Sequence, residues 1–124
     1  MIQEFNDLPW HDAELIEIII DRSRKDNVRL LIKWPEEYGG IRVSIEFYSC
    51  YGLEANMHFG IVPPDFILEA ECISQSLKLD DIKKTWKQMG LDLTELYCFR
   101  ITTNSTNSTI NIFSRGFQMK EAGL

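Results

Sequence analysis

The chain has 124 residues, with 13 Lys and Arg against 19 Asp and Glu, and a formal net charge of −6. This length suits a single domain over residues 1–124, and a domain of that size buries enough surface to fold without disulfides or a metal. The acidic charge counts against nucleic acid or an anionic membrane surface as the main partner.

Alternating apolar and polar residues predict a β-hairpin near the start of the chain. Residues 14–21 are apolar on both faces, which is typical of a central strand beneath a covering layer. Residues 22–26 form a short polar turn, and residues 28–34 alternate as the second strand. A loop with Pro35 and a glycine pair then ends this hairpin.

The clearest strand pattern covers residues 41–47, where Ile, Val, Ile and Phe alternate with polar residues. Residues 53–59 continue the alternation beyond Gly52. This glycine indicates either a bulge within one strand or a tight turn between two strands. If it is a turn, the two segments pair as a hairpin.

The segment between residues 64 and 77 fits either a strand or a helix. We favour a strand, because apolar residues fill both faces and no good helix cap is present. The following helix is clearer and covers about residues 80–89, with Asp80 as the expected N-cap and Gly90 as the C-terminal stop. Ile82, Trp86 and Met89 form its expected apolar stripe.

Two more strands, residues 95–103 and 109–114, surround a polar turn rich in Asn, Ser and Thr, and Phe117 and Met119 extend the second strand. We therefore expect an α+β fold, mainly an antiparallel β-sheet with the one amphipathic helix packed on one face.

The three cysteines are separated by 22 and 26 residues, with no close Cys pair, and lie among apolar neighbours. Such spacing predicts buried free thiols and offers no zinc site. No apolar run approaches the roughly 20 residues of a membrane span, and the N-terminus lacks a signal-peptide pattern, so we expect a cytoplasmic protein.

The most distinctive motif is Trp10-His11-Asp12, directly before the first expected strand. One hypothesis is a ligand contact, because an indole, an imidazole and a carboxylate can converge in an irregular segment. The other is a structural latch, in which Trp10 fills the edge of the core while His11 or Asp12 bonds backbone groups. We favour the latch, since one local cluster without a partner motif is weak evidence for a site.

A second candidate set lies on the expected sheet, where Glu54, Asn56 and His58 share one face and Glu46 shares a face with Arg42 and Ser44. Paired across a hairpin, these would place a carboxylate near His58. The simpler interpretation is the solvated face of an antiparallel sheet, which also offers a docking surface for a partner.

Common catalytic signatures and phosphate-binding glycine loops are missing from the sequence. Only two histidines are present, whereas a catalytic metal usually needs about three protein ligands. We therefore expect neither a metal nor a cofactor.

Residues 8–13 (Leu-Pro-Trp-His-Asp-Ala) and 102–109 (Thr-Thr-Asn-Ser-Thr-Asn-Ser-Thr), with the expected element order, resemble a group of known sequences. These are small uncharacterised bacterial proteins that open with a Trp-His-Asp stretch, and some look like immunity proteins of bacterial toxin systems. The resemblance implies an α+β fold with an antiparallel sheet and a role in neutralising a partner protein. It carries no catalytic residue to this chain.

Two functions follow as hypotheses. The first is a non-enzymatic interaction protein, immunity-like, whose acidic surface attracts a basic partner protein. The alternative is a small enzyme or small-molecule-binding domain that uses His11 and Asp12 with Glu46, Glu54 or His58, and it requires these groups to converge on one pocket. A homodimer formed through a sheet edge or the helix surface is a further expectation.

Overall fold

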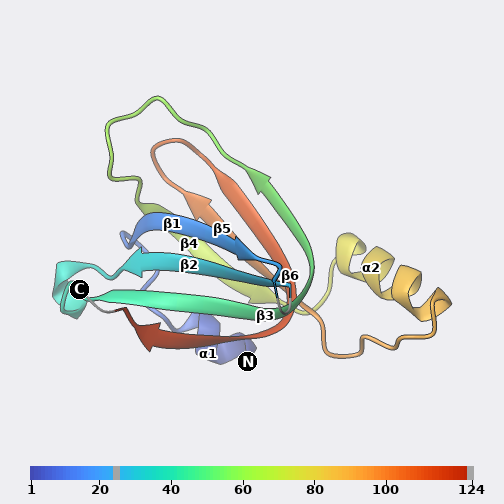
Figure 1. Ribbon diagram of the computed structural model, residues 1–124. Helices are drawn as coiled ribbons and strands as arrows, with labels where there is room; N and C mark the ends of the chain where they lie inside the picture. Colours follow the sequence, from blue (N-terminus) through green and yellow to red (C-terminus); the bar gives the residue numbers. More distant parts are fainter. Residues whose placement is uncertain (24–25, 123–124) are drawn as a thin grey trace.

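The computed structural model describes residues 1–23 and 26–122 and is dominated by one antiparallel sheet (Figure 1). Its strands are β1 (Glu14–Asp21), β2 (Asn27–Lys33), β3 (Arg42–Asn56), β4 (Ile67–Ile73), β5 (Tyr97–Thr103) and β6 (Thr109–Glu121). They lie in the order β1-β2-β3-β6-β5-β4. The helices are α1 (Ile2–Asn6), the 3-10 turn η1 (Glu36–Tyr38) and α2 (Leu77–Gln88).

The sheet curls until its two ends meet at one corner. β1 and β4 are at opposite ends of the strand order, yet Glu14 bridges Phe66. The N–H of Ile67 donates to the carbonyl oxygen of Ala13 at 2.7 Å, and the N–H of Leu15 donates to that of Asp65 at 3.1 Å. The sheet is therefore closed at the start of β1, and beyond Leu15 the outer edge of this strand separates from β4.

The core lies on the concave face of this curled sheet, where alternate side chains of each strand point inward. The expected alternation is confirmed there by buried residues from four strands: Val28, Leu30, Ile32, Val43, Ile45, Phe47, Phe99, Ile101, Ile110 and Ile112. Helix α1, which the sequence patterns did not predict, adds the fully buried Phe5. Its ring lies 5.0 Å from that of Phe99 and 5.2 Å from that of Phe117.

The two expected segments on either side of Gly52 form one long strand. β3 pairs with β6 along its length, from Val43 opposite Glu121 to Asn56 opposite Thr109, with a shift of register between Cys50 and Gly52. The bulge alternative is confirmed and the hairpin between residues 41–47 and 53–59 is wrong. β6 is long enough to satisfy both halves, and a Cβ on Gly52 would stand only 3.2 Å from the Phe113 ring.

β1 forms the expected hairpin with β2, from Glu14 opposite Lys33 to Asp21 opposite Asn27. Its expected central position is wrong, because it lies at the end of the strand order. Apolar residues on both faces do not mean burial on both faces here, since Ile20 is 58% exposed. Arg24 and Lys25, in the expected polar turn, lie outside the described residues.

Helix α2 begins three residues before the expected start at Asp80. Ser76 is its N-cap, and its Oγ accepts a hydrogen bond from the N–H of Leu79 at 3.1 Å. The helix ends at Gln88, and Gly90 follows with a φ of +89°. Met89 is 68% exposed and does not belong to the apolar stripe, because it follows the last helical residue as the C-cap.

The buried side of α2 packs on the sheet face opposite the main core. Leu79 lies in a second cluster with Leu93, Leu96, Cys98 and Phe113. Trp86 adds an edge-to-face contact with Tyr51 of β3, with 5.3 Å between the two ring centroids. Figure 1 shows the helix beside the bend of β3 and β6, so that it covers only one end of that face.

The remaining expectations concern β4 and β6. The segment interpreted as a strand is β4, which pairs with β5, and β6 continues past Gly116 as expected. Neither helix of the described chain has the length and apolar character needed to cross a bilayer.

Candidate functional site

Trp10 is part of the core. It is only 3% exposed, and its ring centroid lies 4.7 Å from that of Phe5 and 5.2 Å from that of Trp34. Its indole Nε1–H donates to the carbonyl oxygen of Phe5 at 2.8 Å. The geometry is that of the structural latch, because a buried indole with a satisfied N–H joins α1 to the sheet.

His11 and Asp12 are exposed beside the start of β4. The Nδ1–H of His11 donates to the carbonyl oxygen of Leu68 at 3.0 Å, and Nε2 lies 3.7 Å from a carboxylate oxygen of Asp12. The hydrogen bond, followed by the Asp12 charge, raises the pKa of His11 above 6.5. Asp12 has a φ of +67°, and its N–H donates to the carbonyl oxygen of Ile67 at 2.9 Å. Both residues therefore fasten the chain to β4.

Glu46 and Glu54 lie far apart on the same strand. Glu46 accepts a hydrogen bond from Nε2 of Gln118 at 2.7 Å, whereas Glu54 lies 3.7 Å from Nζ of Lys78. Eight residues of strand separate them by roughly 25 Å. These two carboxylates do not form one site.

Asn56 and His58 lie near the end of β3. Asn56 is exposed and pairs with Thr109, while the backbone N–H of His58 donates to Oγ of Ser108 at 2.9 Å. Of the seven predicted site residues, His58 alone borders either of the two main hollows of the described chain. Residues 1–23 and 26–122 also contain no cluster of His, Cys, Asp and Glu that could hold a metal ion.

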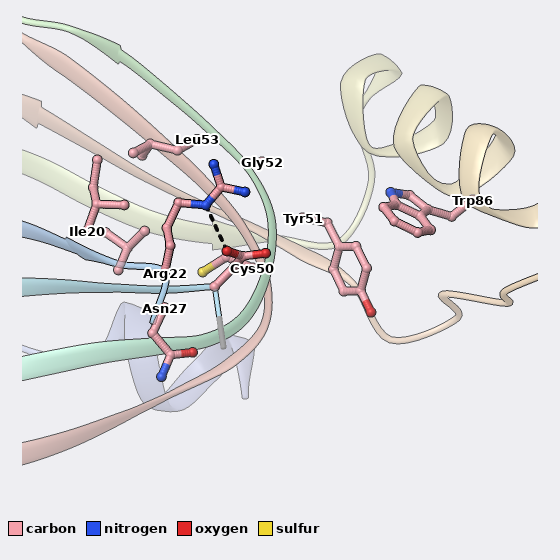
Figure 2. A pocket seen from close by; sticks show the side chains of 10 residues that line it. Ile20, Arg22, Asn27, Cys50, Tyr51, Gly52, Leu53 and Trp86 are labelled. Carbon is pink, nitrogen blue, oxygen red and sulfur yellow. Dashed lines mark hydrogen bonds and ion pairs between the residues drawn. The ribbon is translucent and has the colours of Figure 1, made fainter. Parts of the chain in front are cut away.

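The first hollow lies between the end of the β1–β2 hairpin, the β3 bulge and α2 (Figure 2), and has a volume of about 410 Å³. An ion pair crosses it, from Nε of Arg22 to Oδ1 of Asp26 at 2.9 Å. Tyr51 and Trp86 form its aromatic side. The side-chain oxygen of Asn27 is buried there, and residues 1–23 and 26–122 offer it no hydrogen-bond partner.

The cysteines are unfavourable nucleophiles. Burial raises the pKa of the Cys50 thiol, which lines the first hollow, to about 11. The same cause raises the pKa of Cys72 to about 12 and that of Cys98 to about 11. Because the thiolate is the reactive form, these groups are almost fully protonated and unreactive near neutral pH.

The second hollow, the trough, lies between β1 and the β3–β4 loop (residues 57–66) and has a volume of about 480 Å³. Residues 14–18 of β1 form one wall. Residues 57–61 and 63–65 of the loop form the other, with Thr106 at one end. In Figure 1 this green loop arches beyond the β5–β6 turn.

Hydroxyl groups of the β5–β6 turn hold both ends of the β3–β4 loop. Ser108 binds the N–H of His58, and Thr106 donates to Oδ2 of Asp65 at 2.8 Å. Thr106 also lies within hydrogen-bond distance of Ser108 and Thr103. The Ser- and Thr-rich segment therefore provides turn chemistry that supports one wall of the trough.

The tip of the loop exposes apolar side chains. Phe59 is 87% exposed and Val62 is 89% exposed. Two large exposed apolar side chains on one short loop differ from the scattered apolar residues of an ordinary surface. The tip is therefore a candidate contact surface, on a loop whose ends are fixed.

The charge of the trough is acidic. Among the described residues that line it, Glu14, Glu17 and Asp65 are carboxylates and none is lysine or arginine. Oδ1 of Asp65 is buried and has no hydrogen-bond partner among the described residues, although an unsatisfied buried acceptor is costly.

The sequence patterns did not predict the trough, because its walls come from two segments that are far apart in the chain, residues 14–18 and 57–65. One usable signal was present, since residues 59–64 contain five apolar or proline side chains without strand or helix periodicity. Such a segment is expected to be polar when it forms an ordinary surface loop.

Comparison with models of protein families finds no match for the chain, and comparison with curated protein sequences finds none either.

Proposed function

We propose that this chain is a non-enzymatic binding protein whose trough recognises a basic segment of a partner protein. The observation that carries the proposal is that the exposed Phe59 lines a hollow that three carboxylates also line, with the exposed Val62 on the same loop. Fully burying one side chain of this size contributes about 1.5–3 kcal/mol. The carboxylates supply attraction for a cationic partner and discriminate against an anionic one.

The proposal includes an immunity-like role, in which occupation of the trough inhibits the bound partner. The net charge of −6 supports the preference for a basic partner. We do not extend the proposal to an enzyme built on His11 and Asp12, because the His11 ring and the Asp12 backbone N–H bond β4 and neither residue lines the trough.

The experiment uses the products of the genes that adjoin the gene of this chain. Each is purified and tested for binding by calorimetry at low and high salt, and a basic product that binds is then co-expressed with the chain to measure relief of toxicity. We expect one such partner, with affinity that falls as salt rises.

Two variants and a matched control locate the contact. Phe59→Ser and Glu17→Lys should each weaken binding about tenfold or more, which corresponds to about 1.4 kcal/mol. Leu77→Ser is the control, because Leu77 is 85% exposed on α2 and should leave affinity unchanged. A neighbouring partner that binds both trough variants as tightly as the unaltered chain would refute the proposal.

A further inference from the structure

The outer edge of β1 forms one wall of the trough. β1 is the first strand of the sheet order and pairs with β2 on its inner side. At its start, Glu14 bridges Phe66 and the N–H of Leu15 donates to Asp65. Along residues 16–20, no strand of the described chain pairs with this outer edge. A strand edge of this kind carries backbone N–H and C=O groups ready to pair with another chain.

The sequence of this edge favours strand pairing. Residues 16–20 contain four isoleucines and one glutamate, and β-branched residues are enriched in strands. Proteins commonly protect such edges with lysine or proline, which this stretch lacks. A register shift between Leu15 and Glu17 bends the start of the strand, so the free run begins at Ile16.

We propose that the trough takes an extended basic segment of the partner as an added β-strand on the outer edge of β1, a mode that rests on the function proposed above. In this arrangement, backbone hydrogen bonds to residues 16–20 supply much of the affinity, and alternate side chains supply the specificity. Five residues give ~17 Å of pairing edge.

The side chains that line the trough indicate which residues the bound segment should carry. Leu15 and Ile18 of β1, with Met57 and Phe59 of the loop, offer apolar contacts to alternate side chains of an added strand. Glu14, Glu17 and Asp65 favour Lys or Arg at the intervening positions. The partner segment therefore alternates basic and apolar residues.

A second copy of this chain fits the same edge less well. The start of β1 carries Glu14 and Glu17 and neither lysine nor arginine, so two copies would bring two acidic edges together, and nearby like charges repel. Each copy also carries a net charge of −6. Charge complementarity thus selects a basic segment over a homodimer.

The test uses the peptide acetyl-Lys-Val-Lys-Val-Lys-Val-Lys-amide and two N-methylated forms, one modified at the valines and one at the lysines. Alternate N–H groups of a strand point to opposite edges, so each modified form lacks donors on one edge and keeps its charge and side chains. We expect one modified form to bind about tenfold or more weakly than the parent and the other to retain most of its affinity. Bound parent peptide should slow amide hydrogen exchange at two or more of residues 16–20 by at least about tenfold.

The outcomes separate the mode of binding from the proposed function. Equal binding of all three peptides, or binding without slowed exchange in residues 16–20, would overturn strand addition and leave the basic-segment function standing. Failure of all three peptides to bind would count against both. Slowed exchange in these residues without peptide, together with a dimeric mass by light scattering, would show that a second copy occupies the edge and would overturn the proposal.

Discussion

Two irregular segments of this protein place aromatic side chains in opposite ways. The N-terminal segment buries the indole of Trp10 in the core. The His11 ring and the Asp12 backbone N–H each form a hydrogen bond with a backbone carbonyl of β4. The β3–β4 loop is held at both ends by hydroxyl groups but exposes Phe59 at its tip. The chemically distinctive residues thus stabilise the fold, and the plainer apolar residues form the candidate contact surface.

The largest expected effect is the loss of the latch. Trp10→Ala should lower the free energy of unfolding by about 3–5 kcal/mol, because it leaves a cavity beside Phe5 and Trp34. Urea denaturation measures this change. Phe59→Ala is the matched aromatic control and should stay within about 0.5 kcal/mol of the unaltered protein, since exposed positions tolerate truncation. Similar losses in the two variants would remove the contrast between the segments.

The next effect concerns the hydroxyl groups that hold the loop. Ser108→Ala deprives the N–H of His58 of its acceptor and should cost about 1–3 kcal/mol. Hydrogen exchange at His58 should also become faster. Ser105→Ala, at an exposed position of the same turn, should change neither property. If both serine variants behave alike, the turn does not support the trough in the way described.

The cysteine thiols give a smaller, chemical difference between the folded and unfolded chain. Because burial raises the pKa of Cys50, Cys72 and Cys98 to about 11 or 12, alkylation by iodoacetamide at pH 7.5 should be slow in the folded protein. It should become at least about tenfold faster in urea, where the thiols regain an ordinary pKa. Rapid modification of the folded protein at Cys50 would contradict this and reopen the first hollow as a reactive site.

The smallest effect is the titration of His11. Its hydrogen bond to Leu68 and the charge of Asp12 raise its pKa, so NMR should place its midpoint above 6.5, and Asp12→Asn should lower it. A raised pKa in the folded state stabilises the fold below pH 6.5, and this contribution is lost as the pH rises through the folded-state value. The change in stability is small because the ring is exposed to solvent. A midpoint unaffected by Asp12→Asn would argue against the interaction.

Local patterns predicted the inward faces of the strands, since alternation requires only neighbouring residues. Val28, Leu30 and Ile32 are buried as their spacing indicates. The same alternation does not indicate which strands pair with each other, because strand pairing depends on segments far apart in the sequence. It therefore could not place β1 at the edge or identify β6 as the partner of the whole of β3. The sequence pattern indicated Asp80 as the N-cap, whereas α2 begins after Ser76 and buries Leu79.

The candidate site was less accessible to sequence reasoning than the fold. Residue chemistry directed attention to Trp10, His11 and the carboxylates of the sheet, because indoles, imidazoles and paired carboxylates are common in sites. The trough instead depends on the meeting of Glu14 with Phe66, a contact that follows from the curl of the entire sheet. No local spacing encodes that meeting, so only His58 of the predicted set reaches the trough.

The central claim is that the trough, and not the Trp10–Asp12 segment, is the binding surface. An NMR titration of the isotope-labelled chain with the basic Lys-Val peptide tests it most directly. The account predicts that backbone resonances of residues 14–18 and 57–65 shift together and with one affinity, while those of residues 10–12 stay in place. Shifts centred on His11 and Asp12, with the trough unchanged, would contradict it.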